Sequence, residues 1–248
     1  MNNKEKSSSA QGYGRARETI IISLGGSLMA PDEIDIGFLK SFKHVIQKYI
    51  GSGPTAPRLR GVKFFIIVGG GKVARVYQKA LLEFGAKSND RDWMGIKVTR
   101  LNAEVIKQLF KSDCYPKIIE NPNEKIKTIK KLIIGGGYKP GWSTDYVSVL
   151  IAKNYGIKTI INLSNIDYVH DKDPRKFPDA KRFEEIDWKS FRRIVGDVWE
   201  PGLSMPFDPR ASKLAESLKL KVVVMNGKKL QSLEDFLNNK SFVGTTIQ

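Results

Sequence analysis

The stretch FFIIVGGGK, residues 64–72, decides the fold class of this chain. Its five apolar, strand-favouring residues run without a polar interruption and end in three glycines and a lysine. Continuous apolar runs of this length are typical of parallel strands that are buried on both faces. Glycines after a strand leave backbone N–H groups open to a ligand, and a helix that begins there adds the positive end of its dipole. The stretch therefore predicts a buried strand that ends in an anion-binding turn.

Two further stretches repeat this pattern, TIIISLGGS at 19–27 and LIIGGG at 132–137. A single glycine turn can simply reverse the chain. Three such turns indicate a sheet whose carboxyl edge holds several phosphates, as two bound nucleotides would supply.

Predicted strands and helices alternate along the whole chain. The strands are predicted at 19–24, 62–68, 116–119, 131–134, 158–163, 221–225 and 242–247. The helices are predicted at 34–50, 71–85, 93–111, from 143 onward, and at 187–195, 209–219 and 230–238. Loops are predicted at 51–61 and 196–209 from their glycine and proline content. The alternation favours an α/β fold with a mainly parallel sheet that is covered on both faces.

The composition indicates a folded, basic protein. Hydrophobic residues make up 41% of the 248 residues, which is enough for a sizeable core. Lys and Arg number 42 against 26 Asp and Glu, giving a net charge of +16, so anionic partners are expected. No run of five basic residues and no RNA-binding signature is present, so nucleic acid is an unlikely partner and nucleotides are favoured.

Cysteine, histidine and apolar content exclude several classes of protein. The single Cys114 excludes an internal disulfide, and with only His44 and His170 no cysteine–histidine metal cluster is expected. No apolar run approaches the roughly 20 residues that cross a membrane. Residues 1–17 are polar and rich in serine, so we expect a disordered tail and a cytoplasmic location.

The sequence does not fit the two commonest phosphate-binding motifs. Residues 69–74 match the loose G-x-G-x-x-A fingerprint of dinucleotide sites, but no strand ending in an acidic residue follows about 20 positions later. A Walker A loop is excluded because Val73 stands where Ser or Thr is required. Arg75, one turn into the following helix, is either an exposed helix residue or a ligand for an oxyanion. In GWSTD, residues 141–145, Ser143 or Thr144 is expected to cap a helix.

Seven motifs occur in one order along the chain: GGS 25–27, GGGKVAR 69–75, RDWMGIKVTRLNA 91–103, GWSTD 141–145, SNIDYVHDKDP 164–174, FDPRASKLA 207–215 and GTTI 244–247. In this order they resemble the amino acid kinase family, most closely the archaeal type of its uridylate kinase branch. The resemblance implies a three-layer αβα sandwich. It further implies an acceptor-binding and oligomerisation lobe at 18–164 and an ATP-binding lobe at 165–248.

The resemblance also implies an activity, which is transfer of the γ-phosphoryl group of ATP to UMP with Mg²⁺. A homo-oligomer is implied, with a hexamer favoured. The implied ligands of UMP are Gly70, Gly71 and Arg75 for its phosphate, Asp92 for its ribose, and Thr144 for the acceptor phosphate. The implied residues at the transferring phosphoryl are Gly25, Gly26 and Ser27, with Asp145 orienting the reacting groups. The implied ATP-site residues are Asn165, Asp167, Val169, Asp173 and Pro174. No residue is implied as a dedicated metal ligand.

The chain departs from the family pattern at two places. Ser23 replaces a lysine that many members carry two residues before the glycine pair, and the candidate substitutes are Lys139, which we place in the catalytic set, Lys172 and Arg210. In the ATP loop, Tyr168 replaces a glycine and His170 a tyrosine, so either ring is a candidate to stack on adenine.

Three alternatives to a UMP kinase stay open from the sequence. The first is another small-molecule kinase of the same family. The second is a non-catalytic relative that binds a nucleotide or an oxyanion. The third, which only the net charge favours, is a nucleic-acid-binding protein.

Overall fold

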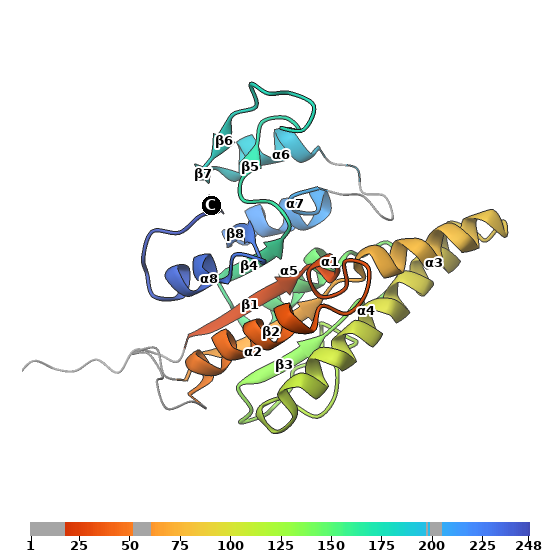
Figure 1. The fold of residues 1–248 in the computed structure, drawn as a ribbon, viewed down its shortest axis with the longest axis vertical. Coiled ribbons are helices and arrows are strands. Elements are labelled where there is room, and N and C mark those ends of the chain that lie inside the picture. Colours follow the sequence, from red (N-terminus) through yellow and green to blue (C-terminus); the bar gives the residue numbers. More distant parts are fainter. Residues whose placement is uncertain (1–17, 52–60, 197, 199–204) are drawn as a thin grey trace, which may run out of the picture.

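A seven-stranded sheet forms the centre of the computed structural model, which describes residues 18–51, 61–196, 198 and 205–248 (Figure 1). The strand order is β3-β2-β1-β4-β8-β9-β7. The strands are β1 Thr19–Leu24, β2 Lys63–Val68, β3 Leu132–Gly135, β4 Thr159–Ser164, β7 Glu185–Ile186, β8 Lys221–Asn226 and β9 Thr245–Ile247. All neighbours pair in parallel except β8 and β9, so the predicted α/β class is confirmed. The predicted tail 1–17 and most of the predicted loop 51–61 lie outside the described residues.

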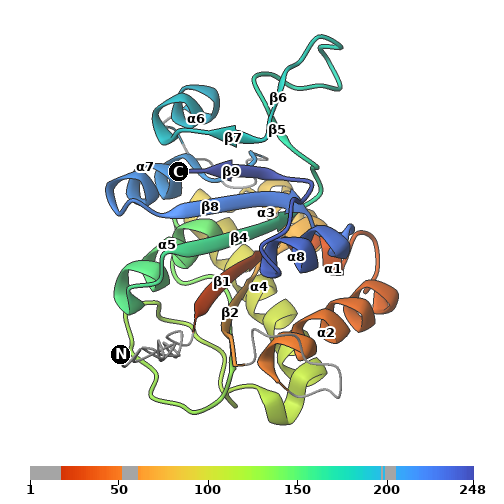
Figure 2. The same ribbon diagram turned by 90° about the vertical axis from the view of Figure 1, so that its left-hand side faces the viewer.

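Helices cover both faces of the sheet (Figure 2). They are α1 Gly26–Met29, α2 Ile36–Ile50, α3 Gly71–Glu83, α4 Ser88–Phe110, α5 Thr144–Tyr155, α6 Trp188–Val195, α7 Pro209–Ser217 and α8 Leu230–Leu237. One buried cluster joins α2, α4 and α8 to one face of the sheet, and a second joins α5, α6 and α7 to the other. Strand β1 serves both, since Ile20 and Ile22 lie in the first cluster and Ile21 in the second. The result is the expected three-layer sandwich.

The observed secondary structure differs from the prediction at the shortest strands and helices. The strand predicted at 116–119 is wrong: only single bridges form there, from Cys114 to Leu132 and from Ile119 to Gly135. Pro116 has no N–H to donate, and the chain bends at this point. Helix α1 and the two-stranded sheet of β5 Val169–His170 and β6 Arg182–Phe183 are not predicted, because such short elements show no period.

The turns after β1 and β2 pack backbone against backbone. A Cβ atom on Gly26 would lie 2.4 Å from both the Gly69 carbonyl oxygen and the Gly71 nitrogen. Gly71 has a φ of +62°, and its own Cβ atom would lie 2.4 Å from the Gly26 carbonyl carbon. The Gly69 N–H donates to the Leu24 carbonyl at 2.9 Å, and the Asn102 amide donates to the Gly69 carbonyl at 2.9 Å. Only glycine at both positions allows the two glycine turns to approach this closely.

No helix in the described part of the chain is both long and apolar enough to span a bilayer.

We predict that Gly26→Ala lowers the free energy of unfolding by about 3 kcal/mol or more, because the added methyl group meets backbone atoms that cannot move independently. Urea unfolding followed by far-UV circular dichroism measures the change. Gly37→Ala in α2 is the matched control, since its Cβ atom would meet nothing closer than 3.4 Å and alanine favours a helix. Equal loss of stability in both variants would contradict the proposed packing constraint.

Candidate active site

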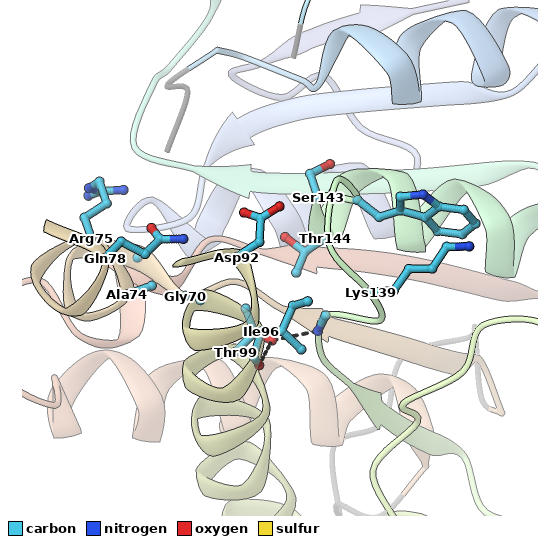
Figure 3. A pocket seen from close by; sticks show the side chains of 14 residues that line it. Gly70, Ala74, Arg75, Gln78, Asp92, Ile96, Thr99, Lys139, Ser143 and Thr144 are labelled. Atoms are coloured by element: carbon cyan, nitrogen blue, oxygen red, sulfur yellow. Dashed lines mark hydrogen bonds between the residues drawn. The ribbon is translucent and has the colours of Figure 1, made fainter. Parts of the chain in front are cut away.

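A cavity of about 200 Å³ lies at the carboxyl edge of the sheet, where α3, α4, the loop after β3 and the start of α5 meet (Figure 3). Its lining consists of Gly70, Gly71, Ala74, Arg75, Gln78, Asp92, Gly95, Ile96, Thr99, Gly137, Lys139, Trp142, Ser143 and Thr144. The cavity therefore brings together five predicted acceptor-site residues from three separate motifs, together with Lys139 of the catalytic set.

Arg75 connects this cavity to the turn after β1. Gly70 precedes α3, Gly71 begins it, and both line the cavity, so the positive end of the α3 dipole lies at the cavity. Arg75 follows one turn later, and its Nη2 donates to Ser27 Oγ at 3.3 Å. One cation thus lies between the cavity and the predicted phosphoryl-facing residues.

Helix α4 forms the wall of the cavity that faces α3. Asp92 and Thr99 point from α4 toward the loop after β3 (Figure 3). Asp92 Oδ2 accepts a hydrogen bond from the Gly141 N–H at 2.7 Å, and the Gly137 N–H donates to Thr99 Oγ1 at 2.7 Å. A Cβ atom on Gly95 would lie 2.6 Å from Gln78 Nε2, so the absence of a side chain at Gly95 leaves room for the end of the Gln78 side chain.

The third glycine run follows the surface of α4 closely. Arg100 donates from Nε to the Gly137 carbonyl at 3.1 Å and from Nη2 to the Tyr138 carbonyl at 3.2 Å. Its Nη1 pairs with Glu120 at 2.6 Å. A Cβ atom on Gly136 would lie 3.1 Å from the Arg100 backbone nitrogen, which leaves little space for a side chain. The role of Arg100 is not visible in the sequence, because its contacts join segments far apart in the chain.

Asp145 directly follows the cavity-lining Ser143 and Thr144, in the first turn of α5, and Ser143 caps this helix by accepting from the Tyr146 N–H at 3.1 Å. Asp145 accepts from Ser23 Oγ at 2.8 Å and from the Asp208 N–H at 3.2 Å. Burial of its carboxyl group, with the nearby Asp208 carboxyl, raises the pKa of Asp145 to about 7, although both hydrogen bonds oppose the shift. Burial also raises the pKa of Asp208.

Ser23 stands where many members of the family carry a lysine, and its hydroxyl group donates a hydrogen bond to Asp145. Of the three candidate substitutes, Lys139 lines the cavity, but its Nζ lies 4.1 Å from the Trp142 ring centroid, at the end of the cavity opposite Arg75 (Figure 3). Lys172 forms an ion pair with Asp179 at 2.7 Å. Arg210 Nη1 donates to the Gly141 carbonyl at 2.7 Å.

One further cation was missed by the sequence analysis. Lys72 directly follows Gly71, whose backbone packs on Gly26, and it pairs with the exposed Asp32. Its position immediately after the triple glycine was the signal that could have identified it.

The predicted ATP-site residues lie beyond β4 and are less closely grouped. Asp167 accepts from Asn226 Nδ2 at 2.9 Å and from Lys229 Nζ at 2.7 Å, and these hydrogen bonds, that of Lys229 first, lower the pKa of Asp167. Val169 is buried, and its N–H donates to Thr245 Oγ1 at 2.9 Å. Lys229 was not predicted, since it comes from the turn after β8.

The other members of this set lie on the same connection. Asp173 pairs with Arg175 at 2.9 Å, while Asn165 and Pro174 are exposed. Tyr168 was a candidate to stack on adenine. The Arg182 guanidinium lies over its ring, 4.8 Å from the centroid, so Arg182 already covers one face of the ring.

The family profile described as "Amino acid kinase family" matches residues 18–226. A uridylate kinase from Pyrococcus abyssi is 32% identical over 92% of this chain and 99% of its own length. One from Methanospirillum hungatei is 33% identical over 92% of this chain and 94% of its own length. The crystal structure of uridylate kinase from Archaeoglobus fulgidus superposes with a TM-score of 0.74 at 26% identity, covering 92% of this chain and 99% of that one.

The buried Asp145 carboxyl predicts a particular dependence of stability on pH. Its pKa is raised from 3.8 when folded, so between about pH 4 and 7 the folded protein binds a proton that the unfolded chain has lost. Its contribution to stability therefore falls as the pH rises through this window and levels off above about 7. An asparagine at this position does not titrate, so Asp145→Asn does not lose stability in this way as the pH rises.

The measurement is the difference in free energy of unfolding between Asp145→Asn and the wild type, from pH 4 to pH 8. Packing and hydrogen-bond costs of the asparagine do not depend on pH, so the difference moves in favour of the variant as the pH rises. Asp187→Asn is the control, since that carboxyl caps α6 and its pKa is lowered by hydrogen bonds from Ser190. A difference for Asp145→Asn that is flat from pH 4 to 7 would contradict the raised pKa.

Proposed function

The chain belongs to the amino acid kinase family, and we propose that it transfers the γ-phosphoryl group of ATP to UMP, giving UDP and ADP. The observation that carries this proposal is the hydrogen bond from Arg75 to Ser27, since it joins the cavity that would hold UMP to the turn that would face the transferring phosphoryl. The archaeal relatives named uridylate kinase, similar over almost their whole length, support the choice of UMP.

The cavity suits a nucleoside monophosphate. Backbone N–H groups at the start of α3 and the Arg75 guanidinium would hold the phosphate. Asp92 uses Oδ2 for the Gly141 N–H, which leaves Oδ1 to accept from a ribose hydroxyl. Thr144, in the first turn of α5, would contact the acceptor phosphate from the other side.

Phosphoryl transfer needs alignment and charge stabilisation more than covalent help. The contact of Gly26 with Gly71 puts the amides of two turns beside each other, one for each nucleotide. Such fixed donors stabilise developing negative charge without reorganising. An ionised phosphate is itself the nucleophile, so no general base is required.

The positive charge that replaces the family lysine comes, in this proposal, from the α3 side of the junction. Arg75 contacts Ser27, and Lys72 directly follows the packed Gly71. Lys139, the substitute expected from the sequence, would instead act at the far end of the cavity, where its Nζ lies over the Trp142 ring.

The carboxyl groups of Asp145 and Asp208 are suited to holding a magnesium ion. Among the described residues, no group of three or more Cys, His, Asp or Glu side chains is arranged to hold a metal ion. Mg²⁺ typically uses one or two carboxylates with substrate phosphates and water, and Asp145 and Asp208, where one carboxyl raises the pKa of the other, would supply them. When bound, the ion would neutralise charge on the phosphates.

ATP would occupy the second lobe, residues 165–248. The residues proposed to hold it are Asn165, Asp167, Val169, Asp173 and Pro174, with Lys229 added because it pairs with Asp167. We place the protein in the cytoplasm, where both nucleotides are available.

We also propose that the chain forms a homo-oligomer, with a hexamer expected, through the outer faces of α3 and α4. Helix α3 buries only Ala74 and projects from the rest of the molecule (Figure 1). Large apolar side chains are exposed on α3, just after its end and on α4: Val76, Tyr77, Leu82, Phe84 and Leu101. A second copy would cover them, because several exposed apolar groups of this size on neighbouring elements are typical of an interface.

The activity test is a titration of UMP at fixed Mg-ATP, with UDP formation measured by chromatography. We expect UMP to be the preferred acceptor over CMP, and acetylglutamate to be inactive. Arg75→Ala is expected to reduce kcat/KM for UMP by roughly 100-fold, since it removes a charge-assisted contact with the phosphate. Arg193→Ala is the control, because that arginine on α6 is exposed, donates to Ser190 and does not line the cavity.

Each alternative has its own outcome. Turnover of acetylglutamate but not UMP would indicate another kinase of the family. UMP binding without UDP formation, followed by calorimetry, would indicate a non-catalytic relative. Salt-sensitive retention of RNA without turnover would indicate a nucleic-acid-binding protein.

Light scattering tests the assembly. Phe84 is 82% exposed, and Phe84→Asp is expected to lower the molar mass to that of a smaller species, because a charge cannot be buried unpaired in an interface. Ile129→Asp is the matched control, since Ile129 is 93% exposed but belongs to the segment before β3 and not to α3 or α4. An oligomer that persists in Phe84→Asp, or is lost in both variants, would contradict the proposed face.

A further inference from the structure

We propose that Arg210, on α7 of the second lobe, is a positioning residue that fixes the far wall of the acceptor cavity. The affinity for the acceptor would then depend on a side chain that does not line the cavity. The identity of the acceptor, UMP, rests on the proposed function; the role of Arg210 in holding the wall does not.

Both polar backbone groups of Gly141 are held by side chains from different parts of the fold. The Gly141 N–H donates to Asp92 Oδ2 on α4 at 2.7 Å. The Gly141 carbonyl accepts from Arg210 Nη1 on α7 at 2.7 Å. Gly141 has a φ of +79°, a conformation that only glycine adopts at low cost, so the two hydrogen bonds hold a turn that the local sequence leaves free.

A row of rings gives Arg210 a second contact with the same wall. Tyr138 and Trp142 lie 5.4 Å apart between ring centroids, and Trp142 and Tyr146 lie 4.9 Å apart. The Arg210 guanidinium lies 5.5 Å from the Tyr146 ring centroid. Arg210 thus contacts Tyr146 at one end of the row, and Lys139 lies over Trp142 in the middle of the row. Cation–π contacts of this kind add to the hydrogen bond in fixing the position of Trp142.

The start of α7 adds further contacts with the residues that follow Gly141. The Asp208 N–H donates to Asp145, and the Asp208 carboxyl accepts from the Ala211 N–H at 2.6 Å, capping α7. Arg210 also lowers the pKa of Asp208 electrostatically, although burial raises that pKa overall.

The consequence is a mechanical link between the two lobes. Asp92, Trp142, Ser143 and Thr144 all line the acceptor cavity, and each is bonded to Gly141 or follows it directly in the chain. Because Arg210 belongs to the second lobe, α7 must be in place for this wall to be in place. A charge-assisted hydrogen bond to a carbonyl is strong enough to select one conformation of a glycine turn.

Kinetics of the full-length Arg210 variants test the proposal. Arg210→Ala is expected to raise KM for UMP about tenfold, the cost of one charge-assisted hydrogen bond, while KM for ATP changes less than about twofold. Arg210→Lys is expected to recover much of the loss, since lysine can donate to the same carbonyl. Arg193→Ala removes the same charge from the same lobe and is expected to match the wild type. An equal rise in both KM values, or no change for UMP, would overturn the proposal.

A double-mutant cycle separates a shared role from two independent ones. If Asp92 and Arg210 both act through Gly141, the combined effect of Asp92→Ala, which removes the acceptor of the Gly141 N–H, and Arg210→Ala on kcat/KM is smaller than the product of the single effects. Multiplicative effects would show that Arg210 does not act through this turn.

Hydrogen exchange of the free protein gives a readout that needs no substrate. In Arg210→Ala the amides of residues 138–146 are expected to exchange faster than in the wild type, while those of α2 do not change. Unchanged exchange over 138–146 would overturn the positioning role. A wild-type protein that forms no UDP would overturn the proposed activity, and the exchange result would still decide the role of Arg210.

Discussion

The close packing of two glycine turns, at Gly26 and at Gly69–Gly71, is the constraint on which the rest of the site depends. Parallel pairing of β1 with β2 brings both turns to the same edge of the sheet, and the absence of side chains lets their backbones touch. This contact places α1 and α3 side by side at their N-terminal ends. Arg75 can then reach Ser27 from the next turn of α3. Two glycine turns that follow different strands thereby meet at one edge of the sheet.

Electrostatics explains why this site tolerates the loss of the strand lysine. Ser23 leaves Asp145 with a neutral hydrogen-bond donor in place of a cation, and burial with Asp208 nearby raises the pKa of Asp145 to about 7. A carboxyl group in such surroundings favours a cation or a proton beside it. The two cations of the cavity lining, Arg75 and Lys139, lie at opposite ends of the cavity (Figure 3). Arg75 donates to Ser27 and Lys139 lies over the Trp142 ring, and no ion pair joins either of them to Asp145 within the described residues.

Much of the fold could be predicted because its signals are long and local. The runs ending at Leu24 and Val68 are continuous and apolar, and the predicted strands match β1 and β2 within a residue. Short elements could not be predicted, since a two-residue strand such as β5 and a four-residue helix such as α1 are too short to show a period. The prediction of a strand at 116–119 was wrong because Pro116 has no N–H group and interrupts the ladder of hydrogen bonds.

The sequence by itself determined the three glycine turns, the layered α/β architecture and the residue types that could face phosphates. Their local signals, apolar runs and glycine clusters, are properties of contiguous residues. Only the tertiary structure decided which of them meet: that Ser23 bonds to Asp145, that Arg100 and Thr99 hold the third glycine run, and that Arg210 and Asp92 grip the same glycine. Such contacts join residues tens of positions apart, and their partners are chosen by the order of strands in the sheet, which no local pattern encodes.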